Sequence, residues 1–321
     1  MFRSPAKNDG AKHSRGRLAR LTIGALAGLV VLGSTFLITN ALNPAGTMRA
    51  VLRAGSEWEK YWPLNKGHYA PDRVVALLYS TGIAKPVQAE VWPGAIFELD
   101  ARDLVARSIL ETGSWEPPVT QAATEILKKD AVMIDVGAHI GYYSILASKA
   151  VGPGGKVVAV EPNPSTLRRL YKNLQLSNAS NVVVEEVANT DRETMLQFFE
   201  SSFSNSGMSS LSEANAIRAP GHSVVTTTVR GRPLDAIVRE LGLRRVDLVK
   251  IDVEGAEVQV LKGMRETLTK LHPVLLVEMD AEQLANMGTS IEQLRALLID
   301  SGYVVARRLD NINFEWVHGT T

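Results

Sequence analysis

The stretch from Val132 to Ser144 constrains the fold of this chain more than any other. It reads Val-Met-Ile-Asp-Val-Gly-Ala-His-Ile-Gly-Tyr-Tyr-Ser, an apolar run that ends at Asp135 and Val136 and leads into two glycines and a helix-like segment. This order predicts a buried strand, a tight turn and the start of a helix. Gly137 lets the backbone approach a ligand, and Gly141 lets the helix pack close to the strand. The turn outlines a cofactor pocket; a purely structural turn is the competing interpretation.

Apolar runs alternate with helix-like segments along the rest of the chain, which predicts an α/β fold with a mostly parallel, Rossmann-like sheet and helices on both faces. The last two runs flank Asp310-Asn311 and predict a C-terminal antiparallel hairpin. A polar segment, Glu200–His222, lies between two further strands and is interpreted either as a cover for a substrate or as a surface insertion. The expected strands are 91–99 (a hairpin), 132–136, 156–160, 182–187, 195–199, 224–229, 246–251, 274–277, 303–307 and 314–317, and the expected helices are 72–79, 118–129, 142–150, 164–178, 233–241, 256–271 and 291–301.

Glu161 stands at the end of the strand that follows the glycine turn, 20 residues beyond Gly141. A carboxylate in that place can accept hydrogen bonds from both hydroxyls of a ribose. The turn lacks the pyrophosphate-binding pattern G-x-G-x-x-G, and the expected strand ends are rich in carboxylates, which suit a sulfonium and an ammonium group better than two phosphates. These observations favour S-adenosylmethionine over a dinucleotide.

The second informative stretch is Asp247–Glu257, Asp-Leu-Val-Lys-Ile-Asp-Val-Glu-Gly-Ala-Glu. Alternation along the strand places Lys250 and Asp252 on one side of the sheet. An unpaired buried carboxylate is costly, so Asp252 is expected to have a function or a partner. For Glu257 the preferred interpretation is an acidic first helical turn that complements the helix dipole.

Several of these segments together resemble FkbM-type S-adenosylmethionine-dependent methyltransferases, over roughly residues 111 to 305. The resemblance is carried by 134–141 (IDVGAHIG), 160–164 (VEPNP), 249–257 (VKIDVEGAE), 261–263 (LKG) and 273–278 (PVLLVE), and less distinctively by 113–117 (GSWEP) and 206–211 (SGMSSL). It implies a class I methyltransferase fold and methyl transfer, usually to a hydroxyl oxygen of a sugar, glycolipid or natural product. His139 departs from the pattern, which usually has Asn there. Its side chain is expected either to donate to the cofactor carboxylate or to be a neutral, hydrogen-bonded loop residue.

The sequence and this resemblance give a set of expected site residues, without separating the roles of base, sulfonium stabiliser and oxygen-rich cation site among the acids. No metal site is assigned. The residues expected to bind the cofactor are Asp135, Gly137, Ala138, His139, Gly141, Glu161, Asn163, Asn189 and Asp252, and the catalytic candidates are Asp252, Glu254 and Glu278.

The N-terminus carries basic residues up to Arg20 and then an uncharged run from Leu21 to Ile38. At 1.5 Å per residue this run spans about 27 Å, close to the thickness of a bilayer core. It predicts a transmembrane anchor over residues 21–39, with a signal peptide cleaved near Thr39–Ala41 as the alternative. The charge asymmetry would keep the N-terminus in the cytoplasm and send the rest outward, which conflicts with a cofactor made in the cytosol. Sidedness therefore stays open.

The expected organisation is a basic cytoplasmic tail (1–20), the anchor (21–39), a linker and N-terminal cap (40–110) and a methyltransferase domain (111–321). The charges nearly balance and give no basic surface for nucleic acid, and the absence of cysteine excludes disulfides and thiol nucleophiles. The predicted function is membrane-anchored O-methylation of a hydroxyl on a sugar, glycolipid or natural-product-like small molecule. Two alternatives are a membrane-tethered, non-catalytic binding module that keeps the fold and a dinucleotide oxidoreductase.

Overall fold

The computed structural model describes residues 39–61, 69–201, 203–217 and 224–319. By its internal contacts the chain divides into two compact units, residues 1–85 and 86–321. The second unit also contains a hairpin and a helix that begin before Glu111, the first residue of the predicted methyltransferase domain. The basic tail and residues 21–38 of the expected anchor lie outside the described residues. Within the described residues no helix has both the length and the apolar character needed to cross a membrane.

Among its described residues, the first unit contains the helices α2 (Pro44–Tyr61) and α3 (Tyr69–Ser80). The sequence predicted α3 but assigned α2 to a linker. Met48 and Leu52 of α2 and Val75 of α3 are buried, and the two helices pack against each other. The apolar contact with α3 thus stabilises α2, whose own composition is mostly polar or small.

The second unit is built on a seven-stranded sheet with the strand order β11-β12-β10-β9-β3-β4-β5. The five strands from β10 to β5 are parallel, and β12 pairs antiparallel with both β10 and β11, as the predicted C-terminal hairpin requires. From β3 the chain runs outward through β4 to β5 and later returns to β9 on the other side of β3, so the order reverses there. The strand bounds are β3 Val132–Val136, β4 Lys156–Val160, β5 Val182–Glu185, β9 Leu248–Ile251, β10 Val274–Glu278, β11 Tyr303–Arg308 and β12 Asn313–His318.

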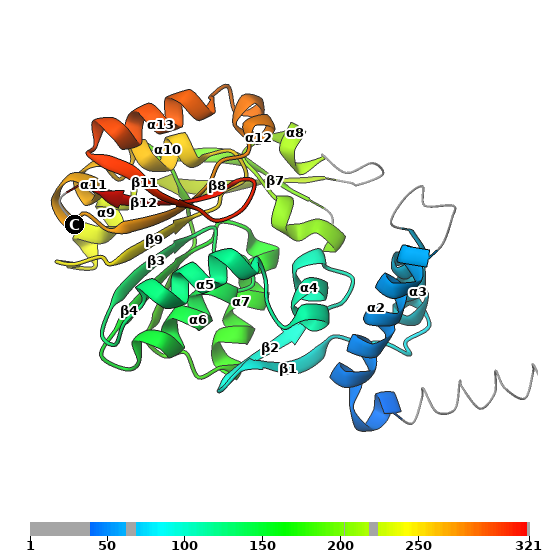
Figure 1. Cartoon of the computed structure of the whole chain (residues 1–321). Helices are drawn as coiled ribbons and strands as arrows, with labels where there is room; N and C mark the ends of the chain where they lie inside the picture. Colours follow the sequence, from blue (N-terminus) through cyan, green and yellow to red (C-terminus); the bar gives the residue numbers. More distant parts are fainter. Residues whose placement is uncertain (1–38, 62–68, 202, 218–223, 320–321) are drawn as a thin grey trace, which may run out of the picture. The chain divides into compact units, whose positions relative to one another are not determined.

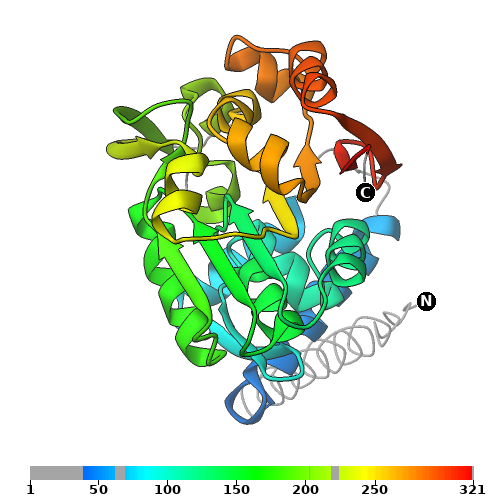
Figure 2. The same ribbon diagram turned by 90° about the vertical axis from the view of Figure 1, so that its left-hand side faces the viewer.

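Helices cover both faces of this sheet, as predicted (Figures 1 and 2). On one face lie α5 (Pro117–Ile126), α6 (Tyr142–Val151) and α7 (Pro164–Leu176), and on the other lie α9 (Leu234–Glu240), α10 (Glu257–Lys262), α11 (Arg265–Leu271) and α13 (Ile291–Asp300). A short helix, α12 (Ala281–Asn286), follows β10 and is capped by Asp280, and the sequence did not predict it.

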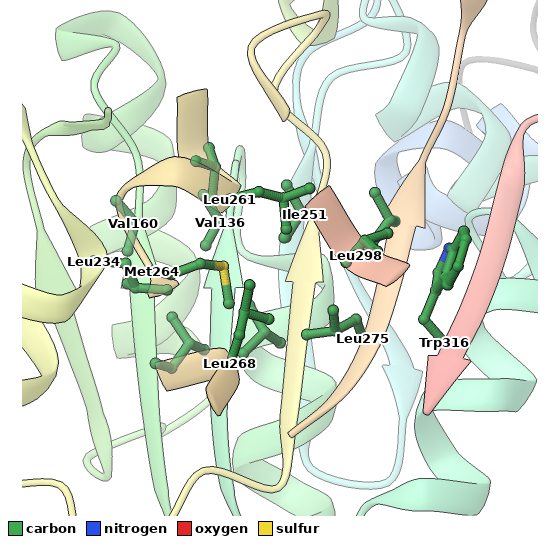
Figure 3. Packing of buried hydrophobic residues seen from close by; sticks show 14 of the residues in the cluster. Val136, Val160, Leu234, Ile251, Leu261, Met264, Leu268, Leu275, Leu298 and Trp316 are labelled. Atoms are coloured by element: carbon green, nitrogen blue, oxygen red, sulfur yellow. The ribbon is translucent and has the colours of Figure 1, made fainter. Parts of the chain in front are cut away.

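One hydrophobic core cluster lies between the sheet and the helices α9, α10, α11 and α13 (Figure 3). The central strands are apolar on both faces, because both faces are covered by helices. Each large side chain buried here contributes about 1.5–3 kcal/mol relative to exposure. The labelled members of the cluster come from strands and helices alike: Val136, Val160, Leu234, Ile251, Leu261, Met264, Leu268, Leu275, Leu298 and Trp316.

The single helix predicted over residues 256–271 is wrong, because the structure has two helices, α10 and α11, with a break at Gly263. A Cβ on Gly263 would lie 2.0 Å from the carbonyl oxygen of Thr190, so the chain passes too close to Thr190 for another residue. Asp235 then starts α11 by accepting hydrogen bonds from the backbone N–H groups of Glu266 and Thr267, each at 2.8 Å. Because these partners come from distant segments, the sequence pattern alone did not reveal the break.

Two smaller strand groups complete the second unit. The hairpin of β1 (Val87–Trp92) and β2 (Ala95–Leu99) was predicted, and it is joined to α7 by side chains of that helix and its end. It leads into α4 (Leu104–Thr112), which was not predicted. A three-stranded sheet contains β6 (Ala188–Asn189), β8 (Val225–Arg232) and β7 (Thr194–Glu200). Between β7 and β8 the polar segment forms the 3₁₀ helix η1 (Phe203–Met208) and the short helix α8 (Glu213–Ala216).

Candidate active site

A cavity opens at the carboxyl ends of β3, β4 and β9, where the order of the parallel strands reverses. Open α/β sheets bind ligands in this place. Its walls are formed by the turn after β3, the residues after β4, the start of β6, the loop after β9 and part of η1. The glycine turn and the acidic stretch after Lys250, which are more than 100 residues apart in the sequence, therefore meet at one site.

The glycine turn fits closely against the loop after β9. Gly137 has φ +90°, and a Cβ there would lie 1.8 Å from the backbone oxygen of Asp252. Only glycine combines this backbone conformation with such a close approach. The N–H groups of Gly137 and Ala138 both donate to the carbonyl oxygen of Val160 at 3.0 Å, which fixes the turn on the neighbouring strand.

Glu161 is held in the floor of the cavity by two backbone hydrogen bonds. Its Oε2 accepts from the N–H of His139 at 2.9 Å, and its Oε1 accepts from the N–H of Asn163 at 2.8 Å. Burial, which these hydrogen bonds oppose, raises the pKa of Glu161 to about 7. Each oxygen keeps a second lone pair, so the carboxylate can accept from the two hydroxyls of a ribose.

Beyond Glu161 the cavity wall becomes apolar and ends in an amide. Pro162, Val187 and Ala188 line it, followed by Asn189. The Nδ2 of Asn189 donates to the carbonyl oxygen of Arg232 at 3.1 Å, whereas its buried Oδ1 has no partner among the described residues. The apolar side chains fit the flat face of an adenine, and the unpartnered Oδ1 of Asn189 can accept a hydrogen bond from its amino group. Both lie next to Glu161, the carboxylate that can bind a ribose.

Lys250 and Asp252 form an ion pair on the other side of the glycine turn, with 2.7 Å between Nζ and Oδ2. The Lys250 side chain is 3% exposed, and its ammonium also lies 4.5 Å from the ring centre of Tyr143. Burial alone would raise the pKa of Asp252, but the attraction and hydrogen bond of Lys250 outweigh it and lower the pKa. Burial conversely would lower the pKa of Lys250, and Asp252, Glu116 and Asp135 reverse that shift. The pair therefore holds Asp252 ionised.

Glu278 is a second partner of Asp252, and its carboxyl group shares a hydrogen bond with that residue. Burial, reinforced by the negative charges of Asp252, Glu254 and Glu257, raises the pKa of Glu278 well above the ordinary value. Asp252 thus contacts both the Lys250 ammonium and the Glu278 carboxyl group, and it keeps 24% of its side chain exposed.

The two remaining acids of the β9 loop have different surroundings. Glu254 lines the cavity with a left-handed backbone (φ +52°), and its Oε2 accepts from Nε2 of Gln283 at 2.5 Å. Glu257 is buried, and its Oε1 accepts from the N–H groups of Val253 at 3.2 Å and Gly255 at 3.1 Å. Glu257 therefore stabilises the loop, consistent with a structural interpretation.

His139 points its ring at η1. Its Nε2 lies 2.8 Å from the hydroxyl of Ser206, which donates its own proton to Asp103, so Nε2 is the donor. Arg169 Nη1 also donates to this Ser206 oxygen at 3.1 Å. Burial, only partly offset by Asp103, lowers the pKa of His139 to about 4. His139 is thus a hydrogen-bonded loop residue whose burial favours the neutral ring, and its expected contact with the cofactor carboxylate stays a prediction.

The structure thus separates the expected site residues into two groups. Gly137, Ala138, His139, Glu161, Asn189, Asp252 and Glu254 line the cavity. The others support it from behind: Asp135 accepts from Ser144 at 2.6 Å, Gly141 begins α6, Asn163 caps α7, and Glu278 contacts Asp252.

Sequence reasoning missed the aromatic part of the wall. Trp115, Tyr142 and Tyr143 line the cavity, together with Val105 and Gly207. They come from the loop before α5, the first turn of α6, α4 and η1. A signal was present in the two tyrosines that directly follow Gly141, because the first turn after a ligand-binding glycine turn faces the ligand.

The fold and the site together define a class I methyltransferase that uses S-adenosylmethionine. The chain belongs to the FkbM methyltransferase domain family, which matches residues 135–305, just over half of the sequence. Membership of this methyltransferase family makes the protein an enzyme whose cofactor is S-adenosylmethionine.

Three relatives illustrate the range of proteins that share this domain. The AMB antimetabolite synthetase AmbE of Pseudomonas aeruginosa is 31% identical over 215 residues, which cover 58% of this chain and 10% of AmbE. The hexuronic acid methyltransferase AglP of Haloferax volcanii is 29% identical over 204 residues, covering 60% of this chain and 77% of AglP. The 2-O-methyltransferase NoeI of Sinorhizobium fredii is 30% identical over 162 residues, covering 47% of this chain and 64% of NoeI. The chain matches only a small part of AmbE, just under two thirds of NoeI and most of AglP.

Proposed function

We propose that this methyltransferase methylates a hydroxyl oxygen on an uncharged, sugar-containing acceptor: a sugar, a glycolipid or a sugar-bearing natural product. The names of AglP and NoeI, a hexuronic acid methyltransferase and a 2-O-methyltransferase, support a sugar-type acceptor. The main observation in favour of a hydroxyl acceptor is the ionised Asp252 at the cavity wall, which can accept the hydroxyl proton.

S-adenosylmethionine supplies an activated methyl group when it is bound. The work left to the protein is to place the acceptor, exclude water and accept the hydroxyl proton. In our proposal Glu161 holds the ribose, Asn189 the adenine, and the backbone of Gly137–His139 the remaining part of the cofactor. Asp135, Gly141 and Asn163 keep these groups in position.

Asp252 is the proposed proton acceptor. Lys250 keeps it ionised, and Glu278 donates a hydrogen bond that orients it. As the hydroxyl oxygen bonds to the methyl carbon, the bond from that carbon to the cofactor sulfur would break with its electron pair left on sulfur, and the hydroxyl proton would pass to a carboxylate oxygen of Asp252 and later to water. Glu254, held by Gln283, is proposed to accept a hydrogen bond from a second hydroxyl of the acceptor.

The same arrangement disfavours a carboxylate as the acceptor. A carboxylate nucleophile needs no base, and in this cavity it would face the negative charges of Asp252 and Glu254. The ammonium of Lys250 is already neutralised by Asp252 at 2.7 Å. Two like charges about 4 Å apart near a protein surface repel each other by about 4 kcal/mol. A neutral hydroxyl compound avoids this cost.

We further propose that residues 21–39 attach the enzyme to a membrane, with the basic residues 1–20 on the cytoplasmic side. The uncharged run and its basic flank support this proposal. Protease treatment of sealed vesicles that carry the full chain measures the sidedness of the methyltransferase domain. Release of the chain from the membrane by high salt alone contradicts the anchor.

The test of the proposed reaction is transfer of a tritiated methyl group by the full-length protein. Acceptors are methyl glycosides of neutral hexoses and 6-deoxyhexoses, a uronic acid glycoside and a glycolipid extract. We expect a base-stable label, as in an ether, on neutral sugars or glycolipids. Replacing Asp252 by Asn should lower kcat by about 10²–10⁴-fold, the usual contribution of a general base. The matched control is Glu292→Gln, an acid in the first turn of α13.

Three other outcomes contradict parts of this proposal. A base-labile label indicates a methyl ester and hence a carboxylate acceptor. Unchanged activity of Asp252→Asn removes Asp252 as the base. Binding of S-adenosylmethionine, measured by calorimetry, with no transfer to any fraction favours a non-catalytic binding module.

A further inference from the structure

The segment Gly113–Glu116 connects α4 to α5. Neither cofactor binding nor the Lys250–Asp252 ion pair accounts for its conformation. It follows α4, which ends at Gly113 in a left-handed conformation, and precedes Pro117, the first residue of α5. Glu116 is also left-handed (φ +42°), and its side chain does not cap α5. Residues other than glycine rarely adopt this conformation unless the surroundings fix it.

The first two residues of α6, Tyr142 and Tyr143, hold this segment in place through hydrogen bonds of their hydroxyl groups. Thr120 donates to the carbonyl oxygen of Trp115 at 2.6 Å, so its oxygen accepts from the hydroxyl of Tyr142 at 3.1 Å. The hydroxyls of Ser114 and Tyr142 also share a hydrogen bond at 3.0 Å. Tyr143 donates to Oε2 of Glu116 at 3.0 Å. Both tyrosines directly follow Gly141, so the cofactor turn and the segment share one rigid support.

The segment lies on the side of the cavity away from the ribose carboxylate. Glu116 Oε1 accepts from Nδ2 of Asn313 at 3.3 Å, and Asn313 begins β12, beside β10. Glu161 follows β4, on the opposite side of β3. Lys250 and Asp252 stand between these two places, at β9. A cofactor whose ribose contacts Glu161 therefore directs its reactive end toward Asp252. The cavity wall on the far side of Asp252 is then left to contact the acceptor.

The side chain that this segment presents to the cavity is Trp115. It is half-buried, and it lines the cavity together with Val105 of α4 and Gly207 of η1. The backbone on both sides of Trp115 is hydrogen-bonded, so the segment that carries the indole costs little entropy to order when a ligand arrives. A rigid indole face next to carboxylates and hydroxyls combines an apolar surface with polar groups at its edge.

We propose that Trp115 is the platform on which the sugar ring of the acceptor stacks, and that it thereby determines specificity. One face of a pyranose ring presents C–H groups that carry a partial positive charge and fit the negative face of an indole. Stacking would leave the ring hydroxyls at the edge, where Asp252 and Glu254 line the cavity. This inference rests on the proposed function and adds the residue that selects the ring.

Trp92 provides a matched control for Trp115. It ends β1, its ring contacts that of Tyr142 with 4.6 Å between the centroids, and it does not line the cavity. Replacing Trp92 by Ala therefore removes an indole from the same aromatic group without touching the acceptor side. Tyr142→Phe tests the support, because it removes only the hydroxyl that holds Ser114 and Thr120.

The experiment is saturation-transfer NMR on the full-length protein with S-adenosylhomocysteine and the methyl glycosides of glucose, galactose, mannose, rhamnose, fucose and N-acetylglucosamine. We expect at least one glycoside to receive saturation at the C–H protons of one ring face. Trp115→Ala should weaken its binding about tenfold or more, Trp115→Phe less, and Trp92→Ala should not change it. Tyr142→Phe should also weaken glycoside binding, because it removes the hydroxyl that supports Ser114 and Thr120.

Glycoside binding that is equal in Trp115→Ala and in the wild type overturns the proposal, as does saturation in none of the six sugars. Loss of S-adenosylhomocysteine binding in Trp115→Ala, measured by calorimetry, also overturns it, because the indole would then serve the cofactor. The proposed methyl transfer fails separately, in the tritium assay with the glycolipid extract, so the two failures are distinguishable.

Discussion

The ammonium of Lys250 lies 2.7 Å from the carboxylate of Asp252, and the two residues stand two positions apart at the end of the central strand β9. Two residues of separation along a strand put both side chains on one face of the sheet. The pair neutralises itself, and the lysine is almost completely buried. Lys250 therefore keeps the Asp252 carboxylate ionised at the cavity wall, although burial alone would favour the protonated carboxyl group.

Replacing Lys250 by Met should abolish methyl transfer and lower the free energy of unfolding by about 3–5 kcal/mol, because it leaves the carboxylate of Asp252 without its counter-ion. Urea unfolding at pH 8 and the tritium assay measure the two effects. The double variant Lys250→Met/Asp252→Asn should recover most of the stability and none of the activity. Full additivity of the two single changes would contradict a direct coupling between them.

Glu161 should make the binding of S-adenosylmethionine depend on pH near neutrality. Its pKa of about 7 in the ligand-free protein means that it gains a proton as the pH falls through 7, and the protonated form has lost acceptor capacity for the ribose hydroxyls. Between pH 8 and pH 6 the dissociation constant should rise about tenfold. Calorimetry at several pH values measures this. Glu161→Gln should bind more weakly and lose the pH dependence; a wild-type affinity that is constant over this range contradicts the assignment.

The raised pKa of Glu161 also predicts the direction of a stability change. Its value in the unfolded chain is the ordinary 4.5, so the ligand-free fold binds the proton more tightly than the unfolded chain. The free energy of unfolding should therefore fall as the pH rises from about 4.5 through 7, and level off above that. Glu161→Gln removes this contribution, and comparing the two proteins by urea unfolding from pH 5 to pH 8 isolates it.

Gly137→Ala should prevent cofactor binding and destabilise the fold by more than about 3 kcal/mol, because the new Cβ would meet the Asp252 backbone oxygen at 1.8 Å. Gly242→Ala is the control. Gly242 also has a positive φ, +62°, but nothing lies within 4 Å of its Cβ position, so the cost should be about 1–2 kcal/mol of backbone strain. Equal losses in the two variants, by urea unfolding, would refute a steric role for the close approach.

Local patterns predicted the repeating part of the fold because each strand carries its own signal. The strand Lys156–Val160 is apolar after its first residue and is bounded by glycines before it and Glu161-Pro162 after it, and it was predicted with the observed bounds. The place of Glu161 at the end of that strand predicted it as a site residue, and it lines the cavity; its contact with a ribose stays a prediction. Parallel strands also determine in advance which ends meet, so the glycine turn and the stretch after Lys250 were expected at one site.

The features that were missed depend on partners distant in the sequence. The break at Gly263 arises from Thr190 and Asp235, and the ring of His139 is directed by Ser206 and Asp103. Trp115 is an ordinary loop tryptophan in the sequence, and its place in the cavity follows from the hydroxyl of Tyr142. These contacts cross between segments, so no periodicity or spacing within one segment encodes them.

Ser206 should control how long the cofactor stays bound. Its hydroxyl donates to Asp103 and accepts from His139 and Arg169, so it joins η1 to the glycine turn, α4 and α7. Ser206→Ala leaves these groups without a shared partner, which should lower the free energy of unfolding by about 1–3 kcal/mol. Because η1 forms part of the cavity wall, the dissociation of S-adenosylmethionine should become about tenfold faster, measured by stopped-flow displacement with S-adenosylhomocysteine. Ser212→Ala is the control on the same segment, since Ser212 caps α8 and does not line the cavity. If both variants release the cofactor at the wild-type rate, η1 does not restrain it, and the network of Ser206 serves stability alone.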